Sequence, residues 1–105
     1  MDLLFPGDRV TGGFGWVTHA VSNGRGVQKL APEMFHGALR PTAAIGVLGI
    51  PGLTSYFGLL ELGQPKEGDT VLISSAAGPV GATAGQIAKM KGCRVIGITG
   101  SKEKC

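Results

Sequence analysis

The sequence predicts an α/β fold built on parallel strands, and the segment from Asp69 to Gly100 carries this prediction. Two short runs rich in β-branched residues, 70–75 and 94–99, are typical of strands that are buried on both faces. Between them lies a turn of small residues, and apolar residues then recur at helical spacing. Two strands joined by a helix within so few residues form a βαβ unit, whose crossover is right-handed.

The helix expected in this unit has one apolar face and a clear C-terminal end. Lys89 and Lys91 suit the negative end of the helix dipole, and Gly92 can adopt the left-handed conformation that ends a helix. The apolar face has the spacing i, i+4, i+7 and i+8 and comprises Val80, Ala84, Ile87 and Ala88.

The turn before this helix has a chemical use. The first backbone N–H groups of a helix lack internal partners, and the helix dipole attracts phosphate to this end. The dinucleotide-binding fingerprint places G-x-G-x-x-G between strand and helix, and this chain offers Ala76-x-Gly78-x-x-Gly81, with Gly85 one turn later. The strand and the helix lie where the fingerprint needs them, which predicts a nucleotide site. The alternative is a tight turn that is rich in glycine for packing alone.

The residues after the second strand indicate which dinucleotide is bound. An NAD site places Asp or Glu about 20 residues beyond the glycines, where the acid holds the ribose 2′-hydroxyl. Residues 98–100 contain no acid, and Ser101 with Lys102 and Lys104 can instead accept a 2′-phosphate. This pattern favours NADPH over NADH. The alternative is that the two lysines belong to a solvated helix start with Glu103.

The composition argues against several functional classes. The chain has 105 residues, the length of one small domain or of a piece of a larger protein. Its net charge of +3 comes from dispersed basic residues that do not interleave with aromatic ones, so we expect no nucleic-acid surface. The sequence has neither a signal-peptide pattern nor an unbroken apolar stretch of about 18 residues, so we expect no membrane span. Cys93 and Cys105 form no disulfide framework, which indicates a reducing, cytoplasmic location.

Residues 1–41 are β-rich, with short turns between the expected strands. Residues 5–10 read as a turn that leads into a strand, and 16–21 and 27–30 are further strand candidates. One face of the second candidate would contain Val17, His19 and Val21.

Residues 42–68 connect this β-rich part to the βαβ unit. A helix is expected after Pro41, and Pro51 would end it. Thr54 can then cap a second helix, with Phe57 on its buried side. The architecture is therefore expected to change somewhere after residue 40.

Several motifs together resemble the medium-chain dehydrogenase/reductase superfamily, most closely its zinc-independent branch of leukotriene B4 12-hydroxydehydrogenase/prostaglandin reductases and bacterial curcumin-type reductases. The resemblance is strong from about Thr42 onward and looser before it. Members of this family are considerably longer, so the chain resembles an internal segment of one. The motifs are IPGLTSYFGLL at 50–60, AAGPVG at 76–81, GQIAK at 85–89 and KGCRVIG at 91–97.

The resemblance implies a fold and a reaction. The fold would be the start of a Rossmann doubly wound parallel sheet, preceded by the β-rich end of a GroES-like catalytic domain. Residues 1–41 would then end the catalytic domain, 42–68 would be connecting helices, and 69–105 would be the first βαβ unit of the NADP-binding domain. The reaction would be NADPH-dependent reduction of the C=C bond of an α,β-unsaturated ketone or aldehyde, in which the protein positions the nicotinamide and stabilises the enolate oxygen.

The resemblance also implies site residues, by their positions in the matching motifs. Tyr56 is a candidate from its chemistry and not from the resemblance: it is the only tyrosine and could donate to the enolate, although packing beside Phe57 and Leu60 explains it better. Thr54 would lie close to the nicotinamide, and Lys104, near Ser101, would pair with the 2′-phosphate. The pyrophosphate would be held by Gly78, Pro79, Val80 and Gly81.

No metal site is expected. A catalytic zinc needs about three Cys, His or carboxylate ligands at suitable spacing, and the chain has no CxxC pair. We expect His19 to be a partly buried strand residue and His36 an exposed one. Cys93 is expected to be a small buried residue and Cys105 a free terminal thiol.

Two other functions remain open. A quinone oxidoreductase would share the fold and the cofactor, and a non-catalytic nucleotide-binding fragment would account for the missing half of the sheet. The expected partner is a small-molecule enone, enal or quinone, with neither nucleic acid nor membrane. A homo-oligomer is also expected, because a parallel sheet with one covering helix leaves apolar surface and strand edges open.

Overall fold

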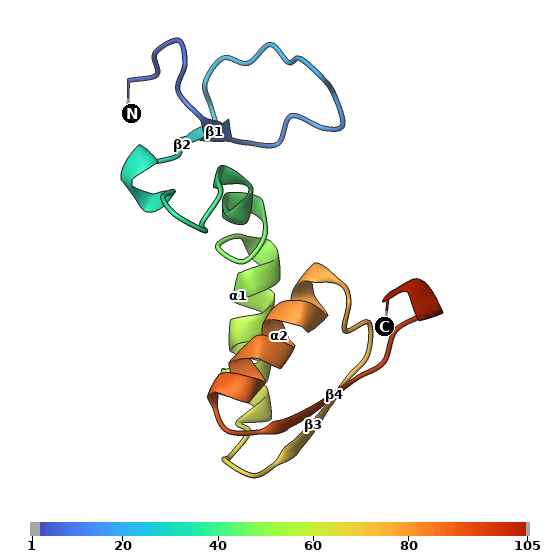
Figure 1. The fold of residues 1–105 in the computed structure, drawn as a ribbon. Helices are drawn as coiled ribbons and strands as arrows, with labels where there is room; N and C mark the ends of the chain where they lie inside the picture. The colour runs from blue at the N-terminus through green and yellow to red at the C-terminus, as the bar shows by residue number, and fades with distance from the viewer. Residues whose placement is uncertain (1–2, 105) are drawn as a thin grey trace. The chain divides into compact units, whose positions relative to one another are not determined.

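The computed structural model describes residues 3–104 of the chain, which form two compact units (Figure 1). The first unit extends to Ala44, and the second begins at Ile45 and contains both α-helices. Within residues 3–104, no helix is both long and apolar enough to cross a membrane. The predicted α/β arrangement lies in the second unit.

The first unit contains two antiparallel strands, β1 (Val10–Thr11) and β2 (Gln28–Lys29). They confirm the strand expected near residue 10 and the one expected at 27–30, although each has only two residues. A short 3-10 helix at Pro32–Met34 follows β2. Regular structure therefore makes up little of this unit.

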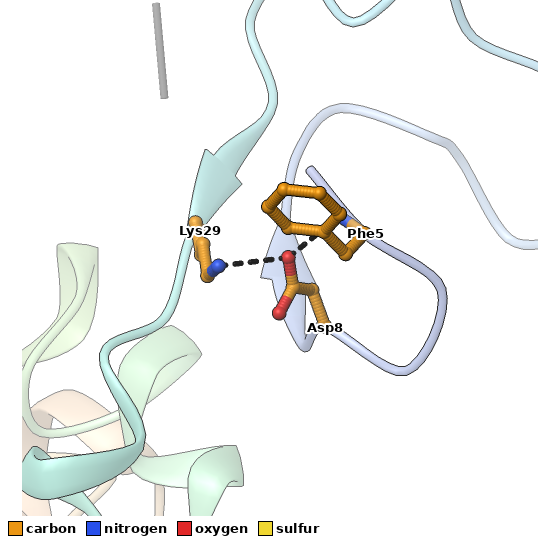
Figure 2. A network of polar contacts seen from close by, with 3 residues as sticks. All are labelled: Phe5, Asp8 and Lys29. Carbon is orange, nitrogen blue, oxygen red and sulfur yellow. Dashed lines mark hydrogen bonds and ion pairs between the residues drawn. The ribbon is translucent and has the colours of Figure 1, made fainter. Parts of the chain in front are cut away.

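A charged contact fixes the turn before β1 against β2 (Figure 2). Lys29 Nζ lies 2.8 Å from Asp8 Oδ2 and 5.7 Å from the centre of the Phe5 ring. The Phe5 N–H donates to the same carboxylate oxygen at 2.8 Å. The hydrogen bond from Lys29, followed by the one from Phe5, holds the pKa of Asp8 below its ordinary value. The ionised form of Asp8 is thus the one that this turn requires.

The strand expected at 16–21 does not form, and these residues belong to the long loop between β1 and β2 (Figure 1). Trp16, Val17 and His19 are exposed, so the expectation that His19 is partly buried is wrong. A strand needs a neighbour that bonds its backbone groups, and within residues 3–104 no strand pairs with this segment. The alternation of apolar residues predicts a strand, but the first unit supplies no partner for it.

The second unit contains the predicted βαβ unit: β3 (Thr70–Ile73), α2 (Pro79–Met90) and β4 (Arg94–Gly97). The two strands are parallel, and their pairing continues beyond β4, where the Ile98 N–H donates to Ile73 O at 2.8 Å. Gly92, between α2 and β4, has a φ of +81°, which confirms the left-handed stop. The sequence from strand to helix to strand therefore folds as its periodicity predicts.

Helix α2 covers one face of this strand pair, and the other face is open. Ala88 of α2 is fully buried, and the nearby Cys93 is buried as expected, with its Sγ donating to Lys66 O at 3.3 Å. On the opposite side, Leu72 of β3 is 63% exposed, and Ile96 of β4 is also exposed. The prediction that both strand faces are buried is wrong for the described residues, because a single helix can cover only one face of a parallel sheet.

The connecting segment differs from its prediction. Helix α1 (Ile50–Tyr56) contains Pro51 in its first turn, where a proline needs no N–H partner, so Pro51 starts this helix and does not end an earlier one. Thr54 lies inside α1 and not at its cap, because its Oγ1 donates to Ile50 O, one turn back, at 2.8 Å. The helix continues as a π-helical turn over Phe57–Gly63. Of the helix expected just after Pro41, only a 3-10 helix at Pro41–Ile45 forms.

Candidate nucleotide-binding site

The turn between β3 and α2 presents free backbone donors. Gly78 occupies the N-cap of α2 with extended backbone (φ −81°, ψ 166°), and Pro79 is the first helical residue. The first bond of the helical pattern runs from the Ala82 N–H to Gly78 O at 2.8 Å. The N–H groups of Val80 and Gly81 precede this bond, so the helix itself provides them with no acceptor. Two donors therefore lie at the positive end of a helix of 12 residues.

Glycine at position 81 is required by the backbone of the turn itself. A Cβ added to Gly81 would lie 2.5 Å from Ser75 O and 2.9 Å from Ala76 Cα. A Cβ on Gly78 would lie 3.2 Å from the same Ser75 oxygen, which also accepts the Gly78 N–H at 2.9 Å. Ser75 has a φ of +50°, which is uncommon for a residue with a side chain. The Ser75 carbonyl thus lies directly beneath the first turn of α2.

Gly97 takes part in the turn, and the sequence pattern does not reveal it. A Cβ on Gly97 would lie 2.6 Å from the Cβ of Ala76, the residue that replaces the first glycine of the fingerprint. The Ala76 N–H also bonds across to Ile98 O at 3.0 Å. The missing first glycine is therefore compensated on β4, where a glycine leaves room for the Ala76 methyl group.

A groove of about 600 Å³ brings Thr54 together with the fingerprint residues. It lies between the helix that begins with α1 and the turn that follows β3, and most of its wall is apolar. Such a site, concave and largely apolar with a few polar groups, is typical of cofactor binding. Its lining comprises Thr54, Ser55, Gly58, Leu59, residues 71–75, Gly78, Pro79, Val80, Gly81 and Ala84.

Tyr56 does not line this groove. It borders a second groove, of about 430 Å³, together with residues of α2 such as Ile87 and Met90. Its ring packs edge-to-face on Phe57, with 5.4 Å between the ring centres. This contact agrees with the interpretation of Tyr56 as a packing residue. A catalytic role for Tyr56 stays a prediction.

Ser101 and the two lysines follow β4, apart from the residues that line the groove. Lys102–Lys104 form a 3-10 turn in which the Lys104 N–H donates to Ser101 O at 3.2 Å. The Thr99 hydroxyl donates to the same oxygen at 3.1 Å. Both lysine side chains are exposed. Two cations thus follow the carboxyl end of β4 closely, and their role toward a 2′-phosphate stays a prediction.

Within residues 3–104, no three His, Cys, Asp or Glu side chains gather as metal ligands would. His36 is exposed, as expected. His19 is also exposed, and its Nδ1 lies 3.2 Å from Thr18 Oγ1. The free thiol expected at Cys105 lies outside the described residues.

Comparison with known proteins identifies relatives of two kinds. The chain is 50% identical over 99 residues to the NADPH-dependent curcumin reductase of Escherichia coli, a match that covers 94% of this chain and 28% of that protein. It is 53% identical over 90 residues to prostaglandin reductase 1 of Oryctolagus cuniculus, covering 86% of this chain and 26% of the relative. The chain thus spans under a third of the length of these curated relatives.

Two solved structures resemble the fold. CurA from Vibrio vulnificus in complex with NADPH matches with a TM-score of 0.60 and 62% sequence identity, over 62% of this chain and 19% of that one. The quinone oxidoreductase of Thermus thermophilus matches with a TM-score of 0.57 and 33% identity, over 67% of this chain and 23% of that one. A scan against models of protein families matches none of them.

The alignment with the curcumin reductase extends over nearly the whole chain and therefore spans the turn between β3 and α2. It agrees with the motifs at 50–60 and 76–97 that resemble one family. The chain therefore belongs to the medium-chain dehydrogenase/reductase superfamily, in the branch of the curcumin and prostaglandin reductases.

Proposed function

We propose that this chain provides the pyrophosphate-binding turn of an NADPH-dependent reductase that acts on the C=C bond of α,β-unsaturated ketones or aldehydes. The observation that carries the proposal is the turn itself, in which Val80 and Gly81 present two free N–H groups at the start of α2. The 50% identity to a curcumin reductase supports the reaction class.

The turn fits a dinucleotide. Its glycines leave the backbone uncovered, so phosphate oxygens can approach the N–H groups of Val80 and Gly81. Thr54, which lines the same 600 Å³ groove from α1, would face the nicotinamide half. Ser101 and Lys104 would hold the 2′-phosphate. NADPH, when bound, supplies the hydride, and this chain contributes binding, orientation and an apolar wall that excludes water.

The finer architecture forms part of the same proposal. Residues 1–41 would be the end of a GroES-like catalytic domain, 42–68 the connecting helices, and 69–105 the first βαβ unit of a doubly wound Rossmann sheet. The antiparallel pairing of β1 with β2 and the parallel pairing of β3 with β4 support this division. A homo-oligomer and a cytoplasmic location stay predictions.

A quinone is the second candidate substrate. The similarity to the Thermus thermophilus quinone oxidoreductase favours it, but the identity is 33% there against 50% with the curcumin reductase. The third possibility, a nucleotide-binding fragment without catalysis, is favoured by the open sheet face around Leu72. We therefore rank enone reduction first.

The test is a graft in which this chain replaces the aligned residues of the Escherichia coli curcumin reductase. NADPH consumption is then followed with an enone and, in parallel, with a quinone. We expect the enone to be reduced at a rate close to that of the parent enzyme. A folded graft that binds NADPH but prefers the quinone would contradict the reaction class, and a folded graft that binds no NADPH would contradict the proposal as a whole.

A further inference from the structure

Ser55 is a buried polar residue that joins the two helices of the second unit. Its side chain lies in α1, and the residue is only 2% exposed. The hydroxyl oxygen lies 2.7 Å from Pro51 O on its own helix and 2.8 Å from Val80 O in the first turn of α2. Its single proton is therefore shared between two carbonyl acceptors, one on each helix.

The two threonine hydroxyl groups on these helices make a different contact. Thr54 Oγ1 donates to Ile50 O and Thr83 Oγ1 donates to Pro79 O, each one turn back on its own helix. These local bonds do not join one helix to the other. The Ser55 hydroxyl, in contrast, reaches a residue 25 positions away along the chain.

We propose that Ser55 is a positioning residue that fixes the nicotinamide end of the groove relative to its pyrophosphate end. This inference rests on the proposed function. Thr54, next to Ser55 on α1, and Val80, whose carbonyl Ser55 contacts, both line the groove, and the proposed function assigns the nicotinamide to Thr54 and the pyrophosphate to the turn that contains Val80. A bound dinucleotide must contact both ends at once, so a fixed separation removes part of the ordering cost of binding.

Alanine is a clean replacement at this position. In an α-helix the carbonyl oxygens of Pro51 and Val80 also accept backbone N–H groups one turn later, so removal of the hydroxyl leaves neither carbonyl without a donor. Alanine is smaller than serine and is the best helix former. We therefore expect Ser55→Ala to fold and to lose only the link between the helices.

The experiment compares two ligands on the full 105-residue chain. NADPH spans both ends of the groove, whereas adenosine 2′,5′-bisphosphate lacks the nicotinamide half. Dissociation constants are measured by calorimetric titration, and folding by circular dichroism. For Ser55→Ala we expect the NADPH dissociation constant to rise about two- to tenfold, as for loss of one hydrogen bond, and that of the bisphosphate to stay within about twofold. Thr83→Ala, which removes a local hydroxyl from α2, should change neither.

The outcomes separate the inference from the function on which it rests. Equal weakening of both ligands by Ser55→Ala would assign the residue a merely structural role and overturn the inference, as would unchanged NADPH affinity. An unmodified chain that binds neither ligand would overturn the proposed function and the inference with it. If Ser55→Ala fails to fold, Ser55→Cys, whose thiol is of similar size but a much weaker donor and so still loses most of the link, replaces it under the same two criteria.

Discussion

The two units of this chain differ greatly in how far their strands are paired and covered. In the second unit, β3 and β4 pair over four residues each, and α2 packs on one of their faces. In the first unit, β1 and β2 pair over two residues each, and the loop between them leaves Trp16 fully exposed. A βαβ unit contains its own pairing partner and its own covering helix, whereas the described part of the first unit has only this two-residue pairing and no α-helix to cover it.

The difference shows where glycine matters. In the second unit, a Cβ on Gly81 or Gly97 would collide with backbone or side-chain atoms of the turn. In the first unit, a Cβ on Gly12 would lie 2.7 Å from the end of the Phe14 ring, a side chain that can move, and a Cβ on Gly13 would meet nothing within 4 Å. A glycine is indispensable where neighbouring atoms lie close to it, as around the proposed nucleotide site at Gly81 and Gly97, and also in α1, where a Cβ on Gly52 would collide with the Val47 carbonyl.

The largest effect is expected from Gly81→Val, because the side chain would collide with Ser75 O and Ala76 Cα. The overpacked turn should lower the free energy of unfolding by about 1–3 kcal/mol and abolish NADPH binding. Gly13→Val is the matched control in the first unit and should change neither quantity. Chemical denaturation and NADPH fluorescence titration measure the two effects, and normal NADPH binding by Gly81→Val would refute this account of the turn.

The contact between Ala76 and Gly97 should give the next largest effect. Gly97→Ala places its methyl group against that of Ala76 and should cost about 1–3 kcal/mol of stability. Adding Ala76→Gly should restore most of the loss, since the fingerprint then has its first glycine and the alanine lies on β4. A double-mutant cycle measures the coupling, and additive effects would show that the two residues are independent.

Lys104→Ala tests the choice of cofactor. Loss of a charge-assisted contact to the 2′-phosphate, at an exposed site, should weaken NADPH by about 1.5 kcal/mol, or roughly tenfold, and leave NADH unchanged. Lys91→Ala removes an equally exposed cation at the C-terminal end of α2 and should have no such effect. Equal losses for NADPH and NADH would show that Lys104 is structural.

The smallest effect concerns the first unit and pH. The pKa of Asp8 is lowered in the folded chain from its ordinary value of 3.8. The ion pair with Lys29 therefore contributes fully to local order at a pH above 3.8, and this contribution is lost as the pH falls through the lower pKa of the folded chain. NMR signals of Phe5 and Lys29 should therefore change together in acid. Asp8→Asn should abolish the transition, while the signals of α2 stay unchanged. A shared transition in both units would contradict this assignment.

Much of the second unit could be predicted, because its determinants are local. The apolar periodicity of α2, the turn at 76–81 and the stop at Gly92 all follow from neighbouring residues. The position of Thr54 within a helix could not be predicted, because a proline such as Pro51 can either end a helix or start one. In the structure Pro51 lies in the first turn of α1, which places Thr54 inside the helix.

The rest depends on contacts between distant residues. Gly97 is required by Ala76 on another strand, and the Ser55 hydroxyl meets Val80 on another helix. The sequence offers a weak signal: Gly52 and Ser55 are both small and three residues apart on α1, which predicts that other backbone approaches this face, and Val47 approaches Gly52 while Val80 approaches Ser55. The prediction of a strand at 16–21 is wrong because alternating apolar residues indicate a strand but do not show that another strand is present to pair with it.

Backbone amide signals of the chain, followed by NMR as NADPH is added, test most directly whether the turn between β3 and α2 binds the pyrophosphate. We expect the amides of Val80 and Gly81 to shift most, in proportion to occupancy, and those of residues 10–29 in the first unit not to move. The chain alone should still fail to reduce an enone, because one βαβ unit leaves the site open. Shifts centred on the first unit, or none at Val80 and Gly81 at saturating NADPH, would contradict the assignment of this turn as the pyrophosphate site.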